Sequence, residues 1–275
     1  MNRLLSYEEK NTPLHRLSGV TKLVFFLLWC LTSALTYDTR VLLVMVGISL
    51  VLYVLSGTTW QQVRSVFAFV MVFMVLNLLA IFMLSPYQGT AIYGTKTILS
   101  PFLPGHALTR EELFYLFNVF IKYFTVVPSV FIFLVTTDPS EFAASLNMVG
   151  LPYTISYSVA IALRYIPDIQ SDFSRIRNAQ EARGIEMSKK ASLPERIRRT
   201  SNIIFPLLFS SMEHIDVVSN AMELRGFGKK KKRTWYAYRK LEFMDILVLS
   251  ATVIFCVAAL CFTFYDGSRY WYPWH

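Results

Sequence analysis

Charged residues and cysteines are scarce in this chain of 275 residues. Asp, Glu, Lys and Arg make up only 16% of the sequence, which is low for a soluble domain and excludes a charge-rich disordered chain. The three cysteines, Cys30, Cys256 and Cys261, match neither a disulfide framework nor a zinc site. All three lie in or beside hydrophobic runs, so we expect buried free thiols. The four histidines are scattered without metal-ligand spacing, and we expect no bound metal.

A phosphate-binding loop is also missing. No glycine begins the pattern G-x-x-x-x-G-K-[ST] that cradles nucleotide phosphates. The stretch Gly226-Phe-Gly228-Lys is too short, and it follows a predicted helix instead of preceding one. We therefore expect a chain without ATPase activity, without catalytic residues and without a cofactor.

Apolar residues, by contrast, are abundant. They make up 54% of the chain, and the mean hydropathy is +0.43. A run of about 20 apolar residues spans the roughly 30 Å hydrocarbon core of a bilayer. Five runs reach or approach that length: Val20–Tyr37, Val41–Gly57, Val63–Leu84, Leu113–Thr136 and Phe243–Tyr265. The sequence therefore predicts an all-α membrane protein with about five transmembrane helices.

Positive charge is concentrated in one part of the chain. Of the 27 Lys and Arg residues, 17 lie between Asp138 and Glu242, in the polar stretch between the fourth and fifth apolar runs. Cytoplasmic segments of membrane proteins carry such an excess of positive charge. The positive-inside rule therefore predicts that the N-terminus and residues 138–242 are cytoplasmic.

This orientation divides the chain into three predicted parts. Residues 1–137 form a membrane portion with four helices, residues 138–242 form a cytoplasmic domain, and residues 243–275 form the last membrane helix and an external C-terminus. The basic run Lys229–Arg233 suits contact with anionic membrane lipids. It lacks the interleaved aromatic residues of a nucleic-acid-binding surface, so we expect no nucleic-acid partner.

Residues 138–242 show the pattern of packed helices. Apolar residues recur in steps of three and four along two stretches, which predicts two long helices packed along a seam. The seam residues are Ile155, Val159, Ala162, Ile166, Ile169, Phe173 and Ile176 in the first stretch, and Ile204, Leu208, Ser211, Ile215, Val218 and Met222 in the second. A connector at Glu186–Pro194 joins them, and a shorter amphipathic helix is expected from Asp138-Pro139 to Gly150. The predicted domain thus has two long crossing helices and one short helix.

One eight-residue pattern occurs twice in the chain. Asn178–Ile185 and Asn220–Phe227, which begin 42 residues apart, share Asn-Ala-x-Glu-x-Arg-Gly followed by an apolar residue. Glycine suits the left-handed conformation that ends a helix, and arginine offers a planar fork of donors for a carboxylate or phosphate. Each copy therefore predicts a helix tip that presents an arginine. Two equivalent tips suggest a partner that comes as a pair.

A set of motifs in a fixed order resembles a known family. The motifs are Thr137-Asp-Pro-Ser-Glu-Phe-Ala-Ala-Ser-Leu146, Gly150-Leu-Pro-Tyr153, Ala162-Leu-Arg-Tyr-Ile-Pro167, Ala182-Arg-Gly184 and Met222-Glu-Leu-Arg-Gly-Phe227. Together they resemble the transmembrane T component of energy-coupling factor transporters, the EcfT/CbiQ family, over essentially the whole chain. Two positions depart from the family pattern. Leu224 stands where alanine is usual, and Ser18-Gly19 stand where Asp-Pro often precedes a basic segment.

The resemblance implies the function of a coupling subunit. It implies a non-catalytic component of an ABC importer in a bacterial or archaeal cell membrane. Its partners would be two ABC ATPase subunits, identical or different, and a small membrane S component that captures a vitamin or a metal ion. The implied ATPase-coupling residues are Ala182, Arg183 and Gly184 in one tip, and Leu224, Arg225 and Gly226 in the other.

Alternative interpretations remain open at this point. Asp168 and Asp172, four residues apart, could share one Mg²⁺ in a polytopic membrane enzyme that acts on a phosphorylated lipid. No second Asp-rich element accompanies them, so the solvated face of a helix explains them more simply. A scaffold that never couples to ATP is a further alternative. Lys122, inside the fourth apolar run, is either a functional charge that faces another span or a lysine that reaches toward the membrane surface.

Overall fold

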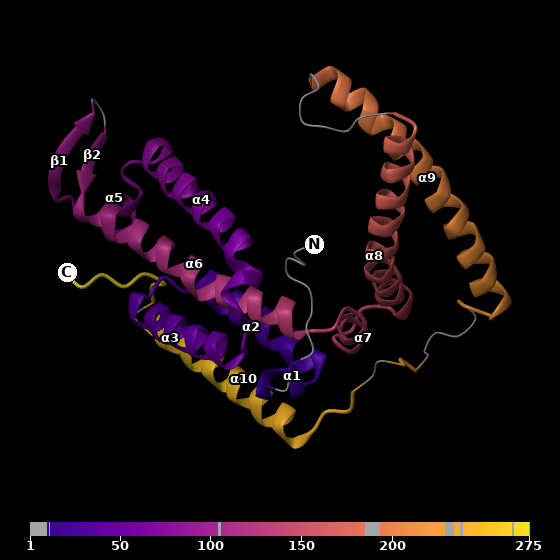
Figure 1. Cartoon of the computed structure of the whole chain (residues 1–275). Coiled ribbons are helices and arrows are strands. Elements are labelled where there is room, and N and C mark those ends of the chain that lie inside the picture. Colours follow the sequence, from indigo (N-terminus) through magenta and orange to yellow (C-terminus); the bar gives the residue numbers. More distant parts are fainter. Residues whose placement is uncertain are drawn as a thin grey trace. The chain divides into compact units, whose positions relative to one another are not determined.

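The computed structural model describes residues 10, 12–103, 106–184, 193–228, 234–236, 239–265 and 267–274. Almost all regular structure among them is helical, which confirms the predicted all-α class (Figure 1). The chain divides into two compact units, of which the first comprises Met1–Asp138 and Arg239–His275 and the second comprises Pro139–Tyr238. The basic run Lys229–Arg233 and most of the predicted connector lie outside the described residues.

The first unit is organised around one long helix, α6 (Arg110–Thr136). This helix packs against α2 (Gly19–Leu35), α3 (Thr39–Leu55) and α4 (Trp60–Leu84). The last helix, α10 (Phe243–Thr263), packs against α2. A short helix, α1, precedes α2 at Pro13–Arg16.

Each of the five predicted apolar runs is helical, but they differ in length. Among the described residues, α4, α6 and α10 are long and apolar enough to cross a membrane. The helices α2 and α3 are apolar but have only 17 residues each. The chain is thus a membrane protein with three helices of spanning length, and the number five stays a prediction for α2 and α3.

Polar side chains set the ends of the two shorter helices. The Ser18 hydroxyl accepts a hydrogen bond from the Thr21 amide and caps α2, which ends at Thr36. Two residues later, the Asp38 carboxylate accepts from the Arg40 amide at 2.9 Å and caps α3. Caps of this kind satisfy amides that lack a partner inside the helix. They explain why the nearly continuous apolar sequence forms two helices and not one.

A small core of aromatic and aliphatic side chains joins α2, α3 and α10. Trp29, which is 2% exposed, packs with Val41, Met45 and Ala259. Its indole nitrogen donates to the Ser49 hydroxyl at 2.9 Å, so its one polar atom has a buried partner.

The three cysteines are free thiols, but they are not equally buried. Cys256 is buried, Cys30 is partly buried and Cys261 is exposed. The expectation of a buried thiol is therefore wrong for Cys261, because α10 packs against the rest of the unit on one side and leaves its other side uncovered.

Short elements that the sequence did not predict connect α4 to α6. They are the helix α5 (Gln88–Tyr93) and an antiparallel pair, β1 (Ile98–Leu103) and β2 (His106–Thr109). The first turn of α6 is tied to them by two fully buried carboxylates, Glu111 and Glu112. Glu111 accepts hydrogen bonds from Thr95, Thr97 and Tyr272, and Glu112 accepts from the Gly89 amide. These bonds fix one end of the central helix.

The second unit has the predicted order of one short and two long helices. They are α7 (Pro139–Met148), α8 (Tyr153–Ala182) and α9 (Leu193–Leu224). At a rise of about 1.5 Å per residue, each long helix is roughly 45 Å long. α7 packs on α8, and α8 packs on α9.

Candidate functional site

The first arginine tip is the C-terminal end of α8. Ala182 is the last helical residue, and Arg183 is the cap, with its amide donating to the carbonyls of Ala179 and Gln180. Gly184 follows at φ +83°, and its amide donates to the Glu181 carbonyl at 3.0 Å. A side chain at Gly184 would meet no atom within 4 Å, so the positive φ and not crowding favours glycine here. The Arg183 side chain is exposed.

The second tip, at the end of α9, has the same construction. Leu224 is the last helical residue, Arg225 follows it, and Gly226 adopts φ +66°. The amide of Gly226 donates to the Glu223 carbonyl, and the amide of Phe227 donates to the Met222 carbonyl at 2.9 Å. This pair of bonds is a Schellman helix ending. The repeated sequence pattern thus corresponds to a repeated helix ending, with an exposed arginine at the cap position of each copy.

The two tips lie at opposite ends of α8. Gly184 directly follows the C-terminal end of this helix, whereas Phe227 of the second tip packs on its N-terminal turns. The Phe227 ring centroid lies 4.7 Å from that of Tyr157 and 5.9 Å from that of Tyr153. Because α8 is about 45 Å long, the structure keeps the two predicted sites apart instead of forming one pocket from them.

Aromatic side chains hold the second tip in place, a feature that the sequence analysis did not identify. Trp235 lies 5.2 Å from Tyr153, centroid to centroid, and its indole nitrogen donates to Asn147 Oδ1 at 3.2 Å. Phe227 of the second tip and Trp235 therefore both pack on the first turns of α8, and Trp235 also contacts the end of α7. At the first tip, the Gln180 side chain donates to the Asn202 carbonyl of α9. Each tip thus contacts the opposite long helix.

The predicted seam between α8 and α9 is only partly closed. A cavity of about 350 Å³ lies between the helices, and the predicted seam residues that line it are Ala162, Ile169, Ser211, Ile215, Val218 and Met222. The seam prediction is wrong for Ile155, Ile166, Ile204 and Leu208, which are 49–51% exposed. The physical reason is that the apolar stripes of the two helices are wider than the strip along which the helices meet. Phe205, Phe209 and Met212 add to this exposed apolar surface on α9.

The paired aspartates of the lipid-enzyme alternative lie on the surface of α8. Asp172 is 3.6 Å from the Arg175 guanidinium, and both aspartates line a polar cavity of about 220 Å³ together with His214. Among the described residues, no group of three or more His, Cys, Asp or Glu side chains is placed to hold a metal ion. The contacts of Asp168 and Asp172 are therefore those of solvent-facing residues on a helix.

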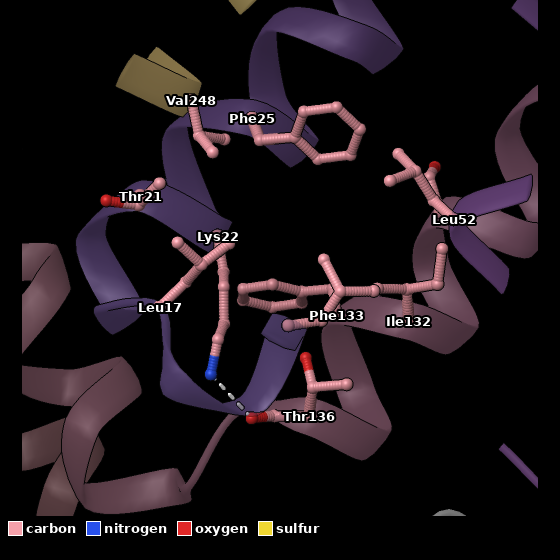
Figure 2. Close-up of a pocket in the computed structure, with 11 residues that line it drawn as sticks. Leu17, Thr21, Lys22, Phe25, Leu52, Ile132, Phe133, Thr136 and Val248 are labelled. Carbon is pink, nitrogen blue, oxygen red and sulfur yellow. Dashed lines mark hydrogen bonds between the residues drawn. The ribbon is translucent and has the colours of Figure 1, made fainter. Parts of the chain in front are cut away.

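A buried polar network lies where the chain leaves the first unit and returns to it. The Lys22 ammonium donates to the carbonyl of Thr136, at the end of α6, at 2.7 Å (Figure 2). The Asp245 carboxylate, at the start of α10, accepts from the Ser18 amide and the Thr21 hydroxyl, each at 2.8 Å. The start of α2 therefore fixes both α6 and α10 just before and just after the second unit in the sequence. Ser18, where the sequence departs from the family pattern, thus has a structural role.

Lys122 has a defined place on α6. Its ammonium nitrogen donates to the Ala34 carbonyl at 3.1 Å and lies 3.2 Å from the centre of the Tyr37 ring. The lysine therefore contacts the C-terminal end of α2.

Comparison with known proteins identifies the family. The family described as "Cobalt transport protein" (CbiQ) matches residues 10–236. The energy-coupling factor transporter transmembrane protein EcfT of Streptococcus equi is 23% identical over 264 residues, 93% of this chain and 94% of the relative. EcfT of Staphylococcus aureus is 34% identical over 134 residues, 48% of this chain and 49% of the relative.

A third relative, the uncharacterized protein MG181 homolog of Mycoplasma pneumoniae, is 26% identical over 175 residues, 60% of this chain and 40% of that protein. The Staphylococcus and Mycoplasma matches thus span half or less of those relatives. None of these relatives favours the lipid-enzyme interpretation. The chain belongs to the CbiQ/EcfT family of energy-coupling factor transporter transmembrane proteins.

Proposed function

We propose that this chain couples ATP hydrolysis to import, and that its two arginine tips dock into the two subunits of an ABC ATPase pair. One observation carries the proposal: the same helix ending occurs twice, with Arg183 and Arg225 exposed at the caps of α8 and α9. Since the tips lie at opposite ends of α8, they suit two separate subunits better than one shared pocket.

The arginines are the proposed anchors of each contact. A guanidinium can form two parallel hydrogen bonds to a carboxylate, which fixes its orientation as well as its position. Loss of one such pair at a buried interface costs about 2–5 kcal/mol, or roughly thirtyfold to several thousandfold in affinity. Ala182 and Leu224 precede the arginines, and Leu224 is 90% exposed. This difference supports two grooves of unequal shape in the ATPases.

The chain itself would transmit motion and not catalyse hydrolysis. α8 packs on both α7 and α9, and α7 directly follows the end of α6 in the sequence. A relative displacement of the two tips would therefore strain the pair of long helices and act on the membrane helices through short connections.

The exposed apolar surface of α8 and α9 is the proposed contact of a small membrane S component. Ile166, Leu208 and Ile215 are all about half exposed or more, although they belong to regular apolar stripes. Burial of apolar area drives association, and a surface of this kind is unusual without a partner. The S component would choose the cargo, a vitamin or a metal ion.

The proposed topology follows the distribution of charge. Residues 138–242 would lie in the cytoplasm with the N-terminus, between a membrane portion at 1–137 and a last span with an external C-terminus at 243–275. The excess of Lys and Arg in residues 138–242 supports this orientation in a bacterial or archaeal cell membrane.

The test is an affinity purification of the full chain from its native membrane in mild detergent. Wild type, Arg183→Glu, Arg225→Glu and the double variant would be compared, and every co-purifying protein identified. We expect each single variant to lose at least about thirtyfold in ATPase affinity and the double variant to lose the ATPases entirely. A small membrane partner should stay bound in all four.

Arg175→Glu is the matched control. Arg175 is also an arginine of α8, and its side chain is 79% exposed, but it lies away from the tip. The control should keep the ATPases at the wild-type level. Full retention of the ATPases by the double variant, or equal loss in the control, would show that the tips are not the coupling sites.

A further inference from the structure

A wide apolar groove opens between α4 and α6 on the first unit. Its volume is about 580 Å³, and it is lined by Leu78, Arg110, Leu113, Phe114, Leu116, Phe117, Phe120 and Trp274. Both helices are of membrane-spanning length, and Leu113 and Phe117 are about half exposed. In a bilayer this groove would therefore face the hydrocarbon region.

One end of the groove, at the N-terminal end of α6, carries a positive charge. Arg110, the first residue of α6, is the only ionisable side chain in the lining, and its guanidinium lies 3.6 Å from the centre of the Trp274 ring. Among the described ion pairs, none involves Arg110. The adjacent carboxylates of Glu111 and Glu112 are engaged with the segment between α4 and α6 instead. Among the residues that the structure describes, no carboxylate therefore neutralises the positive charge at the groove end.

The length of the groove matches one leaflet of a membrane. From Arg110 to Phe120 the lining covers ten residues of helix, or about 15 Å along the axis. That is half of the roughly 30 Å hydrocarbon core. A transmembrane helix of a partner would need a surface of the full thickness. An apolar groove of half that length, with a cation at the interface end, has the dimensions and charge pattern of a single phospholipid.

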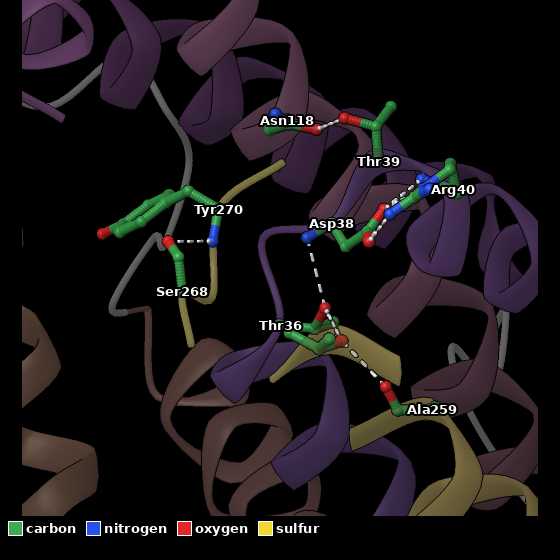
Figure 3. A network of polar contacts seen from close by, with 9 residues as sticks. Thr36, Asp38, Thr39, Arg40, Asn118, Ala259, Ser268 and Tyr270 are labelled. Carbon is green, nitrogen blue, oxygen red and sulfur yellow. Dashed lines mark hydrogen bonds and ion pairs between the residues drawn. The ribbon is translucent and has the colours of Figure 1, made fainter. Parts of the chain in front are cut away.

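A second groove provides a natural comparison. It lies between α3 and α10, has a volume of about 270 Å³ and is lined by apolar side chains and Arg40. Arg40 donates to both carboxylate oxygens of Asp38, at 2.8 and 3.1 Å (Figure 3). Its guanidinium also rests on Phe262 and Trp271. The charge of Arg40 is thus neutralised by Asp38, whereas no ion pair of Arg110 occurs in the described part of the chain.

We propose that the groove between α4 and α6 is a binding site for an anionic phospholipid. One acyl chain lies against Leu113, Phe117 and Phe120, and the phosphate accepts hydrogen bonds from Arg110. A guanidinium stacked on an aromatic ring keeps its N–H groups directed outward in its plane, where they can bind a phosphate in a bidentate manner. This site is separate from the arginine tips and does not depend on coupling to an ATPase.

The test is native mass spectrometry of the full chain, purified in mild detergent and titrated with dioleoyl phosphatidylglycerol or with zwitterionic dioleoyl phosphatidylcholine. We expect wild type and Arg40→Ala to retain one phosphatidylglycerol in preference to phosphatidylcholine. Arg110→Ala should bind phosphatidylglycerol about tenfold more weakly, because it loses charge-assisted hydrogen bonds to the phosphate. Equal binding of the two lipids by wild type, or equal losses in Arg40→Ala and Arg110→Ala, would overturn the proposal.

Leu113→Trp tests the acyl-chain part independently of charge. Leu113 is 52% exposed in the groove, so a larger side chain can fill the space without disturbing the core. We expect this variant to keep its thermal stability and to lose bound phosphatidylglycerol. If it keeps the lipid and instead loses a co-purifying membrane protein, the groove holds a partner helix and the proposal is wrong.

Discussion

The two compact units differ in which side chains they bury. The first unit buries several polar and charged side chains, whereas the second unit buries few side chains of any kind among the described residues. The first unit buries Lys22, Glu111, Asn118 and Asp245, and each of these side chains has hydrogen-bond partners within the unit. In the second unit, the only fully buried apolar side chains among the described residues are Ala143, Ala144 and Ile203. The first unit also exposes many apolar side chains, but its long helices are apolar enough for lipid to cover them.

The helices α8 and α9 are more polar than these spans, yet they expose residues such as Ile215 and Leu224. The comparison indicates that internal contacts determine the conformation of the first unit, whereas the surface of the second unit is suited to partners. Substitutions should therefore affect folding in the first unit and assembly in the second.

The largest effect on stability is expected at Asp245. The change Asp245→Ala removes a buried carboxylate that accepts from the Ser18 amide, the Thr21 hydroxyl and the Glu242 amide. Hydrogen bonds to charged groups contribute about 1.5–3 kcal/mol each, so we expect a loss of about 3 kcal/mol or more. Thermal unfolding in detergent would measure it. Asp168→Ala, at an exposed position of α8, is the control and should leave the midpoint unchanged.

A smaller and local effect is expected at the second tip. Phe227→Ala removes the ring that packs on Tyr153 and Tyr157, and aromatic pairs contribute about 0.5–1.5 kcal/mol each. Hydrogen exchange should become faster at residues 220–228 and stay unchanged at residues 178–184, which form the first tip. Equal acceleration at both tips would contradict the separate anchoring of the second tip.

The smallest effect on stability is expected on the exposed face of α9. Leu208→Gln and Ile215→Gln replace side chains that are 51% and 60% exposed, so each should change the free energy of unfolding by less than about 0.5 kcal/mol. Both should nevertheless lower the amount of membrane partner that co-purifies. Leu42→Gln, at a fully buried position of α3, is the opposite control and should lower the midpoint of thermal unfolding. Marked destabilisation by the α9 changes would mean that this face is part of the chain's own core.

The local features of the molecule were predictable from the sequence. The apolar runs predicted the five long helices of the first unit, α2, α3, α4, α6 and α10, and the spacing of three and four predicted α8 and α9. The helix ends at Gly184 and Gly226 were predictable because a positive φ is a local requirement that glycine meets best. The order of one short and two long helices in the second unit was also predictable, because helix starts and the spacing of apolar residues are local features of the sequence.

Contacts between distant residues were not predictable. Nothing in the sequence indicated that Asp245 would bind Ser18, 227 residues away, or that Phe227 would pack on Tyr157. The expected seam was wrong at Ile166 and Leu208 because periodicity shows which face of a helix is apolar but not what covers it. The pairing of Arg40 with Asp38, and the absence of an ion pair at Arg110 among the described residues, likewise depend on the folded structure.

The most direct test of the account places a photo-crosslinking amino acid at position 182 or position 224, one residue before each arginine. Both positions are exposed, and the probe avoids the three native cysteines. In native membranes, irradiation should link each position to an ABC ATPase subunit, and a probe at position 164, exposed in the middle of α8, should give no such product. Crosslinks from 182 or 224 only to a membrane protein, or to no ATPase at all, would contradict the assignment of the two tips as coupling sites.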